Sequence, residues 1–222
     1  MNPKLDIIIP HYKEEWEIGE KLFTMIRLQR GIDFNDIRVT VINDGGHQLP
    51  AKCFRNIGYT VRQINVPHGG VSAARNAGID NATAEWVMFC DFDDVFASLY
   101  ALRDIMTVLP ADGYDVLWSQ MIAENLTDEE KFIYFTPKTQ TWVFTHGKVY
   151  RRTFLNDNNI RFNTALTFNE DSEFNARVIA RLDYHRIGEI KSQCPMYIWV
   201  KRDNSVTHSG RTKLLTGISD GT

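Results

Sequence analysis

The sequence is poor in cysteine and contains no long apolar run. Its three cysteines, Cys53, Cys90 and Cys194, lie far apart and form no Cys-x-x-Cys pair, so neither a zinc knuckle nor a thioredoxin-like redox site is expected. We predict that they are buried free thiols in a reducing compartment. No stretch reaches the roughly 18 apolar residues of a transmembrane helix, and residues 1–10 do not resemble a signal peptide. We therefore expect a cytoplasmic protein, or one attached peripherally to the inner face of a membrane.

A strong excess of one charge is also absent. The 222 residues include 28 Asp and Glu against 25 Lys and Arg, for a formal net charge of -3. This balance provides no general attraction to a polyanion, so nucleic acid is not an expected partner. Hydrophobic residues make up 43% and charged residues 24%, which is typical of a globular protein. Since we find no internal repeat or linker, we predict one domain over residues 1–222. The sequence indicates no oligomeric state.

Apolar strands alternate with amphipathic helices in the first half of the chain, which predicts an α/β fold with a mainly parallel sheet. In the second half the pattern is less regular. Strands are predicted at 5–10, 37–42, 60–66, 85–91, 116–122, 132–135, 141–144 and 196–201. Helices are predicted at 14–30, 72–79 with Ser72 as N-cap, 98–109 and 171–182.

Polar side chains follow several of these strands, and ligands of parallel sheets bind at the carboxyl ends of the strands. The sharpest case is Asp91, Asp93 and Asp94 after the strand at 85–91. Crowded carboxylates repel one another unless a cation neutralises them, and Mg²⁺ or Mn²⁺ with a nucleotide diphosphate would do so. The alternative is a solvated loop, and Asp94 in particular could simply cap the next helix. His11, Tyr12 and Asp44 follow two other strands, so we expect all three segments at one rim.

Three weaker motifs accompany this rim, and each has a structural alternative. Asp44 begins a glycine turn and could accept a hydrogen bond from a base or a ribose, or only shape the turn. The small-residue loop at 69–78 contains Arg75 and could bind phosphate at a helix N-terminus, or only pack against the sheet. Asp171 lies in the first turn of a predicted helix. It could act as a general base, or it could be there only because the helix dipole favours a carboxylate. His208 could complete a metal site or lie on the surface; no role is predicted for the other histidines.

Taken together, these segments resemble family 2 glycosyltransferases of the GT-A fold, with a Rossmann-like mixed sheet flanked by helices. The similarity spans roughly residues 5–209. The matching segments are, in chain order, DIIIPHY at 6–12, NDGG at 43–46, SAARNAG at 72–78, DFDD at 91–94, GKVYRR at 147–152 and EDSEF at 170–174.

The resemblance implies a metal-assisted, inverting transfer of a sugar from a nucleotide sugar, most often UDP-linked, to an acceptor hydroxyl. A glycan, a lipid-linked glycan or another hydroxyl compound would be the acceptor, as in polysaccharide biosynthesis. Residues 1–95 would form the nucleotide-sugar half, 96–210 the acceptor half and 211–222 a tail. The resemblance implies that Pro10, Tyr12 and Glu14 line the nucleotide pocket, that Asp44 binds the base, and that Arg75 lies near the base or diphosphate. It also implies that Asp91 contacts ribose or metal, and that Asp93 and His208 ligate Mn²⁺ or Mg²⁺. Asp171, supported by Glu170, would deprotonate the acceptor.

The sequence departs from the family pattern at three points. Asn43 replaces the first Asp of a usual pair, which leaves Asp44 alone to read the base, and Gly46 replaces a common Ser. No Gln-x-x-Arg-Trp segment occurs, so the resemblance implies non-processive transfer.

Two other functions fit parts of the sequence. Asp91 to Val95 also matches the Asp-x-Asp-x-Val start of haloacid-dehalogenase-like phosphatases, in which Asp91 would be the nucleophile. That motif normally lies near the start of the chain, whereas here it follows three strand segments. A non-catalytic domain that binds sugar nucleotides or glycans is the third hypothesis.

Overall fold

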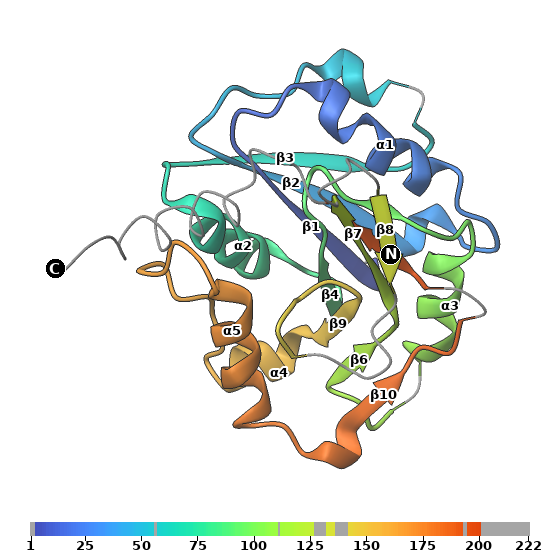
Figure 1. Ribbon diagram of the computed structural model, residues 1–222, viewed down its shortest axis with the longest axis vertical. Coiled ribbons are helices and arrows are strands. Elements are labelled where there is room, and N and C mark those ends of the chain that lie inside the picture. Colours follow the sequence, from blue (N-terminus) through green and yellow to red (C-terminus); the bar gives the residue numbers. More distant parts are fainter. Residues whose placement is uncertain are drawn as a thin grey trace, which may run out of the picture.

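The computed structural model describes residues 3–55, 57–110, 112–126, 132–135, 142–192 and 195–200. Two sheets form its frame (Figure 1), a seven-stranded sheet in the order β10-β6-β9-β4-β1-β2-β3 and a four-stranded sheet in the order β5-β11-β7-β8. Across the described parts of the chain, no helix combines the length and the hydropathy needed to cross a membrane. The predicted tail and His208 lie outside the described residues.

The large sheet is mixed, and its strand bounds are close to those predicted for the first half of the chain. Its strands are β1 (Leu5–His11), β2 (Ile37–Asp44), β3 (Val61–Val66), β4 (Trp86–Phe89), β6 (Val116–Trp118), β9 (Lys148–Arg151) and β10 (Ile187–Glu189). Strand β1 pairs in parallel with β2 and β4, β2 with β3, and β6 with β10. Strand β9 alone among the paired strands of this sheet runs antiparallel, between β4 and β6. The small sheet contains β5 (Val95–Phe96), β7 (Met121–Leu126), β8 (Phe132–Phe135) and β11 (Tyr197–Trp199).

Helices cover both faces of the large sheet, which explains why β1 is apolar at consecutive positions. Ile7 and Ile9 belong to the core on one side, and Ile8 belongs to the core on the other. The first side is closed by α1 (Trp16–Arg27) and α3 (Ala101–Val108), the second by α2 (Gly70–Asn81), α4 (Arg152–Asp157) and α5 (Glu170–Ile179). Short 3₁₀ turns lie at Phe34–Asp36, Ala51–Phe54 and Tyr184–Arg186.

The start of α2 differs from the prediction. The helix begins at Gly70, and Ser72 lies inside its first turn instead of capping it. The cap comes from elsewhere in the chain, because the Asp44 carboxylate accepts the N–H groups of Gly69 at 2.8 Å and Gly70 at 2.9 Å. Free N–H groups at a helix start can be satisfied by any nearby acceptor, and here the acceptor is at the end of β2.

The second half of the chain contains further corrections. The strand predicted at 116–122 is two strands, because the chain leaves the large sheet after β6 and enters the small sheet at β7. Residues 142–144, the described part of a predicted strand, form no strand. The backbone oxygen of Phe144 instead accepts side-chain hydrogen bonds from Lys148 and Asn175. Cys90 is buried as predicted, Cys53 is only half-buried, and Cys194 lies outside the described residues.

Candidate active site

The carboxyl ends of β1, β2 and β4 meet at one rim of the large sheet, as the sequence predicted. His11 is in register with Asn43, and the N–H of Cys90 donates to the backbone oxygen of Ile8. Tyr12, Asp44 and Asp91 therefore lie at or just after the ends of neighbouring strands. Strand β9 runs the other way, so the loop before it, at 144–147, reaches the same rim. This loop is the part of the rim that the sequence did not predict.

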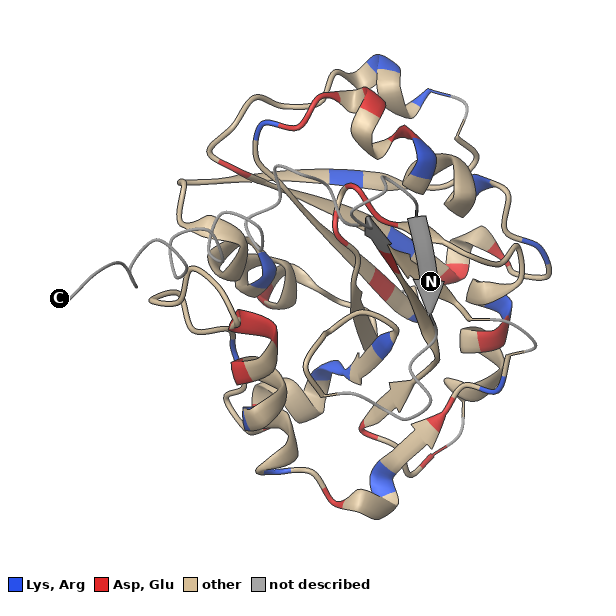
Figure 2. Cartoon of the chain, in the orientation of Figure 1, with Lys and Arg blue, Asp and Glu red and all other residues tan. Residues whose placement is uncertain are grey.

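Arg75 joins Asp91, at the end of β4, to the start of α5. Its side chain is buried, and its two terminal nitrogens donate to three carboxylates. Nη2 lies 2.7 Å from Asp91 Oδ1, and Nη1 lies 2.8 Å from Asp171 Oδ1 and 3.1 Å from Glu170 Oε1. Figure 2 shows the acidic start of α5 beside the basic segment of α2. Arg75 thus binds carboxylates with both terminal nitrogens, although we expected it near a base or diphosphate.

Asp171 is held at both carboxylate oxygens. Arg75 occupies Oδ1, and Oδ2 accepts the Thr145 N–H at 3.0 Å and the Thr145 hydroxyl at 2.9 Å. These bonds come from α2 and from the loop before β9, so two separate elements orient one carboxylate. Thr145 was not predicted from the sequence.

His146 lies between two of the three aspartates that follow β4. Its Nε2 is 3.2 Å from Asp91 Oδ2 and 3.3 Å from Asp94 Oδ2. Burial would lower the pKa of His146, but the hydrogen bonds and charges of Asp91 and Asp94 outweigh it and raise that pKa to about 10. Burial would raise the pKa of Asp91, but Arg75 and His146 hold it well below its usual range. The two neighbouring carboxylates therefore favour the protonated form of His146.

One interpretation of the sequence was that Asp94 caps the next helix. In the structure the N-cap of α3 is Tyr100, and Asp94 makes other contacts. Its Oδ2 accepts the Tyr197 hydroxyl at 2.9 Å, and its Oδ1 accepts the Val200 N–H at 2.9 Å. Asp94 is buried, and burial raises its pKa despite the nearby His146. Its contacts attach β11 to the rim.

The donor atoms at this rim suit a divalent cation. One ligand atom each of Asp91, Asp94 and His146 lies within 4.8 Å of the other two, and carboxylate oxygens with an imidazole are ligands that Mn²⁺ accepts. His146 would have to lose its proton before it could coordinate. Asp93 is half-buried on the same turn. The predicted ligands Asp91, Asp93 and His208 remain a prediction, since His208 lies outside the described residues.

The side of the rim that we predict to bind the nucleotide is built from the loops after β1 and β2. Glu14 shapes the first loop, because its Oε2 accepts the Tyr12 N–H at 2.9 Å and its backbone oxygen contacts His11 Nε2 at 2.9 Å. Pro10 is half-buried within β1. Asp44 is engaged with the two amides of α2 and with His68, whose ring stacks on Tyr12.

Both departures from the family pattern at the β2 turn have a physical reason. Asn43 Nδ2 donates to the Gly46 backbone oxygen and to Asn65 Oδ1, each at 3.0 Å. A carboxylate could not make these donations. A Cβ at Gly46 would lie 1.3 Å from the Tyr12 backbone oxygen, so a serine would displace the Tyr12 loop.

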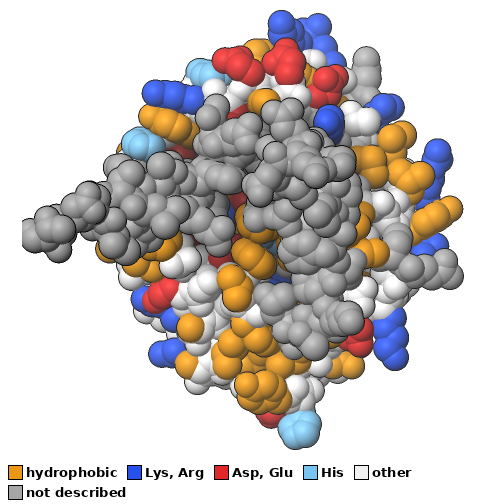
Figure 3. All heavy atoms as spheres, viewed as in Figure 1, with side chains coloured by type: hydrophobic (Ala, Val, Ile, Leu, Met, Phe, Trp, Pro, Cys, Tyr) orange, Lys and Arg blue, Asp and Glu red, His pale blue; other side chains and the backbone are white. Residues whose placement is uncertain are grey.

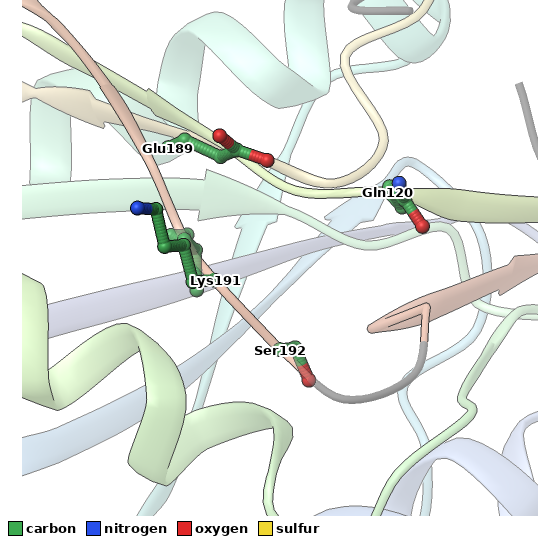
Figure 4. A pocket seen from close by; sticks show the side chains of 5 residues that line it. Gln120, Glu189, Lys191 and Ser192 are labelled. Carbon is green, nitrogen blue, oxygen red and sulfur yellow. The ribbon is translucent and has the colours of Figure 1, made fainter. Parts of the chain in front are cut away.

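A cavity of about 180 Å³ lies beyond β6, lined by Gln120, Glu189, Ile190, Lys191 and Ser192. In Figure 4 the Lys191 and Glu189 side chains point away from each other and do not converge on a shared centre. Among the described residues, none that lines this cavity forms a hydrogen bond with Arg75 or with the three carboxylates that Arg75 binds. We therefore do not assign this cavity to the candidate active site.

Comparison with known proteins supports the fold and identifies the family. The Glycosyl transferase family 2 profile matches residues 6–171. Poly(ribitol-phosphate) beta-N-acetylglucosaminyltransferase TarS of Staphylococcus aureus strain MW2 is 26% identical over 206 residues, which cover 87% of this chain and 35% of TarS. The chain thus spans about a third of the length of that relative.

Two solved structures share the fold. The TarS 1–349 complex with UDP-GlcNAc superposes with a TM-score of 0.71 at 23% identity, covering 93% of this chain and 61% of that one. A mannosyltransferase from Pyrobaculum calidifontis with GDP-Man and Mn²⁺ gives a TM-score of 0.65 at 14% identity, covering 100% and 66%.

These matches exclude the phosphatase hypothesis, because haloacid-dehalogenase-like enzymes form a different family. The profile covers more than half of the chain and includes the segments at the rim, from the start of β1 to Asp171. The described strands and helices have the arrangement found in both solved structures. The chain therefore belongs to glycosyl transferase family 2 and has the GT-A fold.

Proposed function

We propose that this chain transfers a sugar from a uridine diphosphate sugar to an acceptor hydroxyl, with inversion and one transfer per binding event. The observation that carries the proposal is the orientation of the Asp171 carboxylate by Arg75 and Thr145. Arg75 also binds Asp91, one of the residues whose carboxylate could hold a metal ion. The TarS structure with UDP-GlcNAc supports a uridine nucleotide and makes N-acetylglucosamine the first sugar to test.

The nucleotide would bind at the ends of β1 and β2. Tyr12 offers an aromatic face, and Asp44 offers a carboxylate that accepts a ring N–H, which uracil carries. Pro10 and Glu14 would line this pocket, and Glu14 already holds the Tyr12 backbone. The diphosphate would extend toward Asp91, where the strand ends bring the two sides together.

A bound Mn²⁺ or Mg²⁺ would neutralise charge on the leaving diphosphate. Asp91 and Asp93 are the residues we expect to hold it, with Asp94 and His146 close enough to contribute. Arg75 forms ion pairs with Asp91, Glu170 and Asp171 and so offsets part of their mutual repulsion.

Asp171 would act as the general base. Its Oδ1 keeps one lone pair beyond that used by Arg75, and its side chain is 12% exposed, so an acceptor hydroxyl can approach. The proton moves from that hydroxyl to Asp171 while the acceptor oxygen attacks C1 of the donor sugar. The C1–O bond to the diphosphate breaks on the opposite face, which inverts the configuration.

The test compares Asp171→Asn with Glu173→Gln, a change in the same helical turn at an exposed ion pair with Arg177. UDP release from UDP-GlcNAc is measured with a panel of hydroxyl acceptors, and circular dichroism checks the fold. Loss of a general base lowers rates by about 10²- to 10⁴-fold, so we expect such a loss for Asp171→Asn and nearly full activity for Glu173→Gln. Full activity of a folded Asp171→Asn would remove the proposed base. UDP binding by the unaltered chain without turnover on any acceptor would favour the binding-domain hypothesis.

A further inference from the structure

Two rings from separate loops stack at the nucleotide side of the site. Tyr12 follows β1 and His68 precedes α2, and their ring centroids lie 4.4 Å apart with an interplanar angle of 17°. His68 belongs to no motif that we recognised in the sequence. It contacts Tyr12 and Asp44, the two residues expected to hold the nucleobase.

His68 also contacts the carboxylate that would read the base. Its Nδ1 lies 2.8 Å from Asp44 Oδ2, and Oδ2 accepts the Gly70 N–H as well. Asp44 Oδ1 accepts the Gly69 N–H, and the Asp44 side chain is only 5% exposed. A base that approached Asp44 in this arrangement would meet the imidazole first.

The contacts of His68 are those that a uracil ring would make. Uracil would stack on Tyr12 and donate its ring N3–H to Asp44, and the imidazole stacks on Tyr12 with a ring nitrogen at Asp44. We propose that His68 occupies the nucleobase position in the nucleotide-free protein, and that a uridine nucleotide binds by displacing its side chain. This inference rests on the proposed function of Asp44 and Tyr12 in base recognition.

The local structure allows this displacement without a change of the backbone. The His68 side chain is 57% exposed, so rotation about its side-chain bonds can carry the ring into solvent. Asp44 would stay in place, because the Gly69 and Gly70 amides still hold it. The backbone around His68 packs closely on the β2 turn, where a Cβ at Gly45 would lie 2.8 Å from His68 Cβ.

The experiment measures UDP affinity by calorimetry for the unaltered chain, His68→Ala and His185→Ala. His185 is an exposed histidine in the turn before β10 and serves as the matched control. Removing the competing ring should lower the Kd of His68→Ala for UDP by about tenfold, or 1.4 kcal/mol. His185→Ala should bind as the unaltered chain does. His68→Phe, which keeps a stacking ring without a ring N–H, should fall between the unaltered chain and His68→Ala.

Each outcome decides the proposal. Unchanged or weaker UDP binding by folded His68→Ala would overturn it, and weaker binding would assign His68 to the bound state. If the unaltered chain binds UDP and His68→Ala binds no more tightly, this inference fails while the proposed function stands. If neither protein binds UDP, both fail. Should His68→Ala not fold, the same comparison is made with His68→Phe, for which binding no tighter than that of the unaltered chain overturns the proposal.

Discussion

At the scale of single residues, the site depends on one buried guanidinium. Arg75 donates to Asp91, Glu170 and Asp171, and its side chain is 3% exposed. The three carboxylates raise its pKa further above the ordinary arginine value, despite an opposing effect of burial. Arg75 therefore stays protonated at neutral and moderately alkaline pH.

Removing this charge should be costly. We expect Arg75→Ala to lower the free energy of unfolding by about 3–5 kcal/mol, because it leaves buried carboxylates without their partner. Urea denaturation gives the value directly. Arg177→Ala, which breaks an exposed pair with Glu173, should cost less than about 1 kcal/mol. Equal losses in the two variants would show that Arg75 contributes no more than a surface ion pair.

Tyr59, which lies outside the candidate site, leads to a prediction about how stability depends on pH. Burial raises its pKa above the ordinary value of 10.0, and its hydroxyl donates to the Phe23 backbone oxygen. The folded protein keeps this proton at a pH where the unfolded chain loses it. Stability contributed by Tyr59 is therefore complete below pH 10.0 and decreases as the pH rises above it.

We expect Tyr59→Phe to be slightly less stable than the unaltered chain at pH 7, by about 1 kcal/mol for the lost hydrogen bond. Above pH 10 its stability should fall less steeply. Thermal melts between pH 7 and 11 test both expectations, and parallel curves for the two proteins would contradict the role given to Tyr59.

At the scale of elements, the loop before β9 supplies what the strand ends alone do not. Strand β9 is antiparallel to β4 and β6, so its first residues reach the rim where the other strands finish. Thr145 from this loop holds Asp171, and His146 lies between Asp91 and Asp94. Lys148 stabilises the loop through the Phe144 backbone oxygen.

Thr145 should affect the rate without affecting nucleotide binding. Thr145→Val removes the hydroxyl that lies 2.9 Å from Asp171 Oδ2 and keeps the backbone N–H. A hydrogen bond to a charged group contributes about 1.5–3 kcal/mol, so kcat should fall by tenfold or more, with KM for the donor little changed. Thr145→Ser should restore the rate. A merely structural role would instead lower the melting temperature and leave kcat as it was.

At the scale of the whole molecule, two groups of acidic residues differ in their surroundings. Exposed acids gather over the start of α1, at the upper edge of the face shown in Figure 3. The others, at the rim, are paired with Arg75, His68 and His146. The net charge of -3 therefore does not reveal that the carboxylates at the rim share a few basic partners, with Arg75 alone bound by three of them.

The segments predicted as a nucleotide half and an acceptor half are connected in two ways. Strand β9 pairs with β4 of the first half and with β6 of the second, so one sheet continues through both. Arg75 makes a second connection, from Asp91 in the first half to Asp171 in the second.

Local sequence patterns were sufficient to predict much of the fold and of the candidate site. The apolar run of β1, the acidic turn after β4 and the acidic start of α5 are contiguous in the chain, so hydrophobic period and residue type reveal them. The shortest elements escaped detection, since the two-residue β5 and the three-residue β10 contain too few positions to show a period. Ser72 was misjudged because its helix is capped by Asp44, which lies 25 residues or more before the amides that it binds.

The motifs at the rim, their order in the chain and the family follow from the amino-acid sequence alone, because each motif is contiguous, whereas His68, Thr145 and His146 belong to none of these motifs. Which residues pair does not follow from it. Arg75 and Asp171 are separated by 96 positions, and Asp91 and His146 by 55. Their contacts arise only when α2, α5 and the loop before β9 pack on one sheet, since burial in that packed rim makes each charge require a partner. The stack of His68 on Tyr12 likewise exists only because two loops meet there.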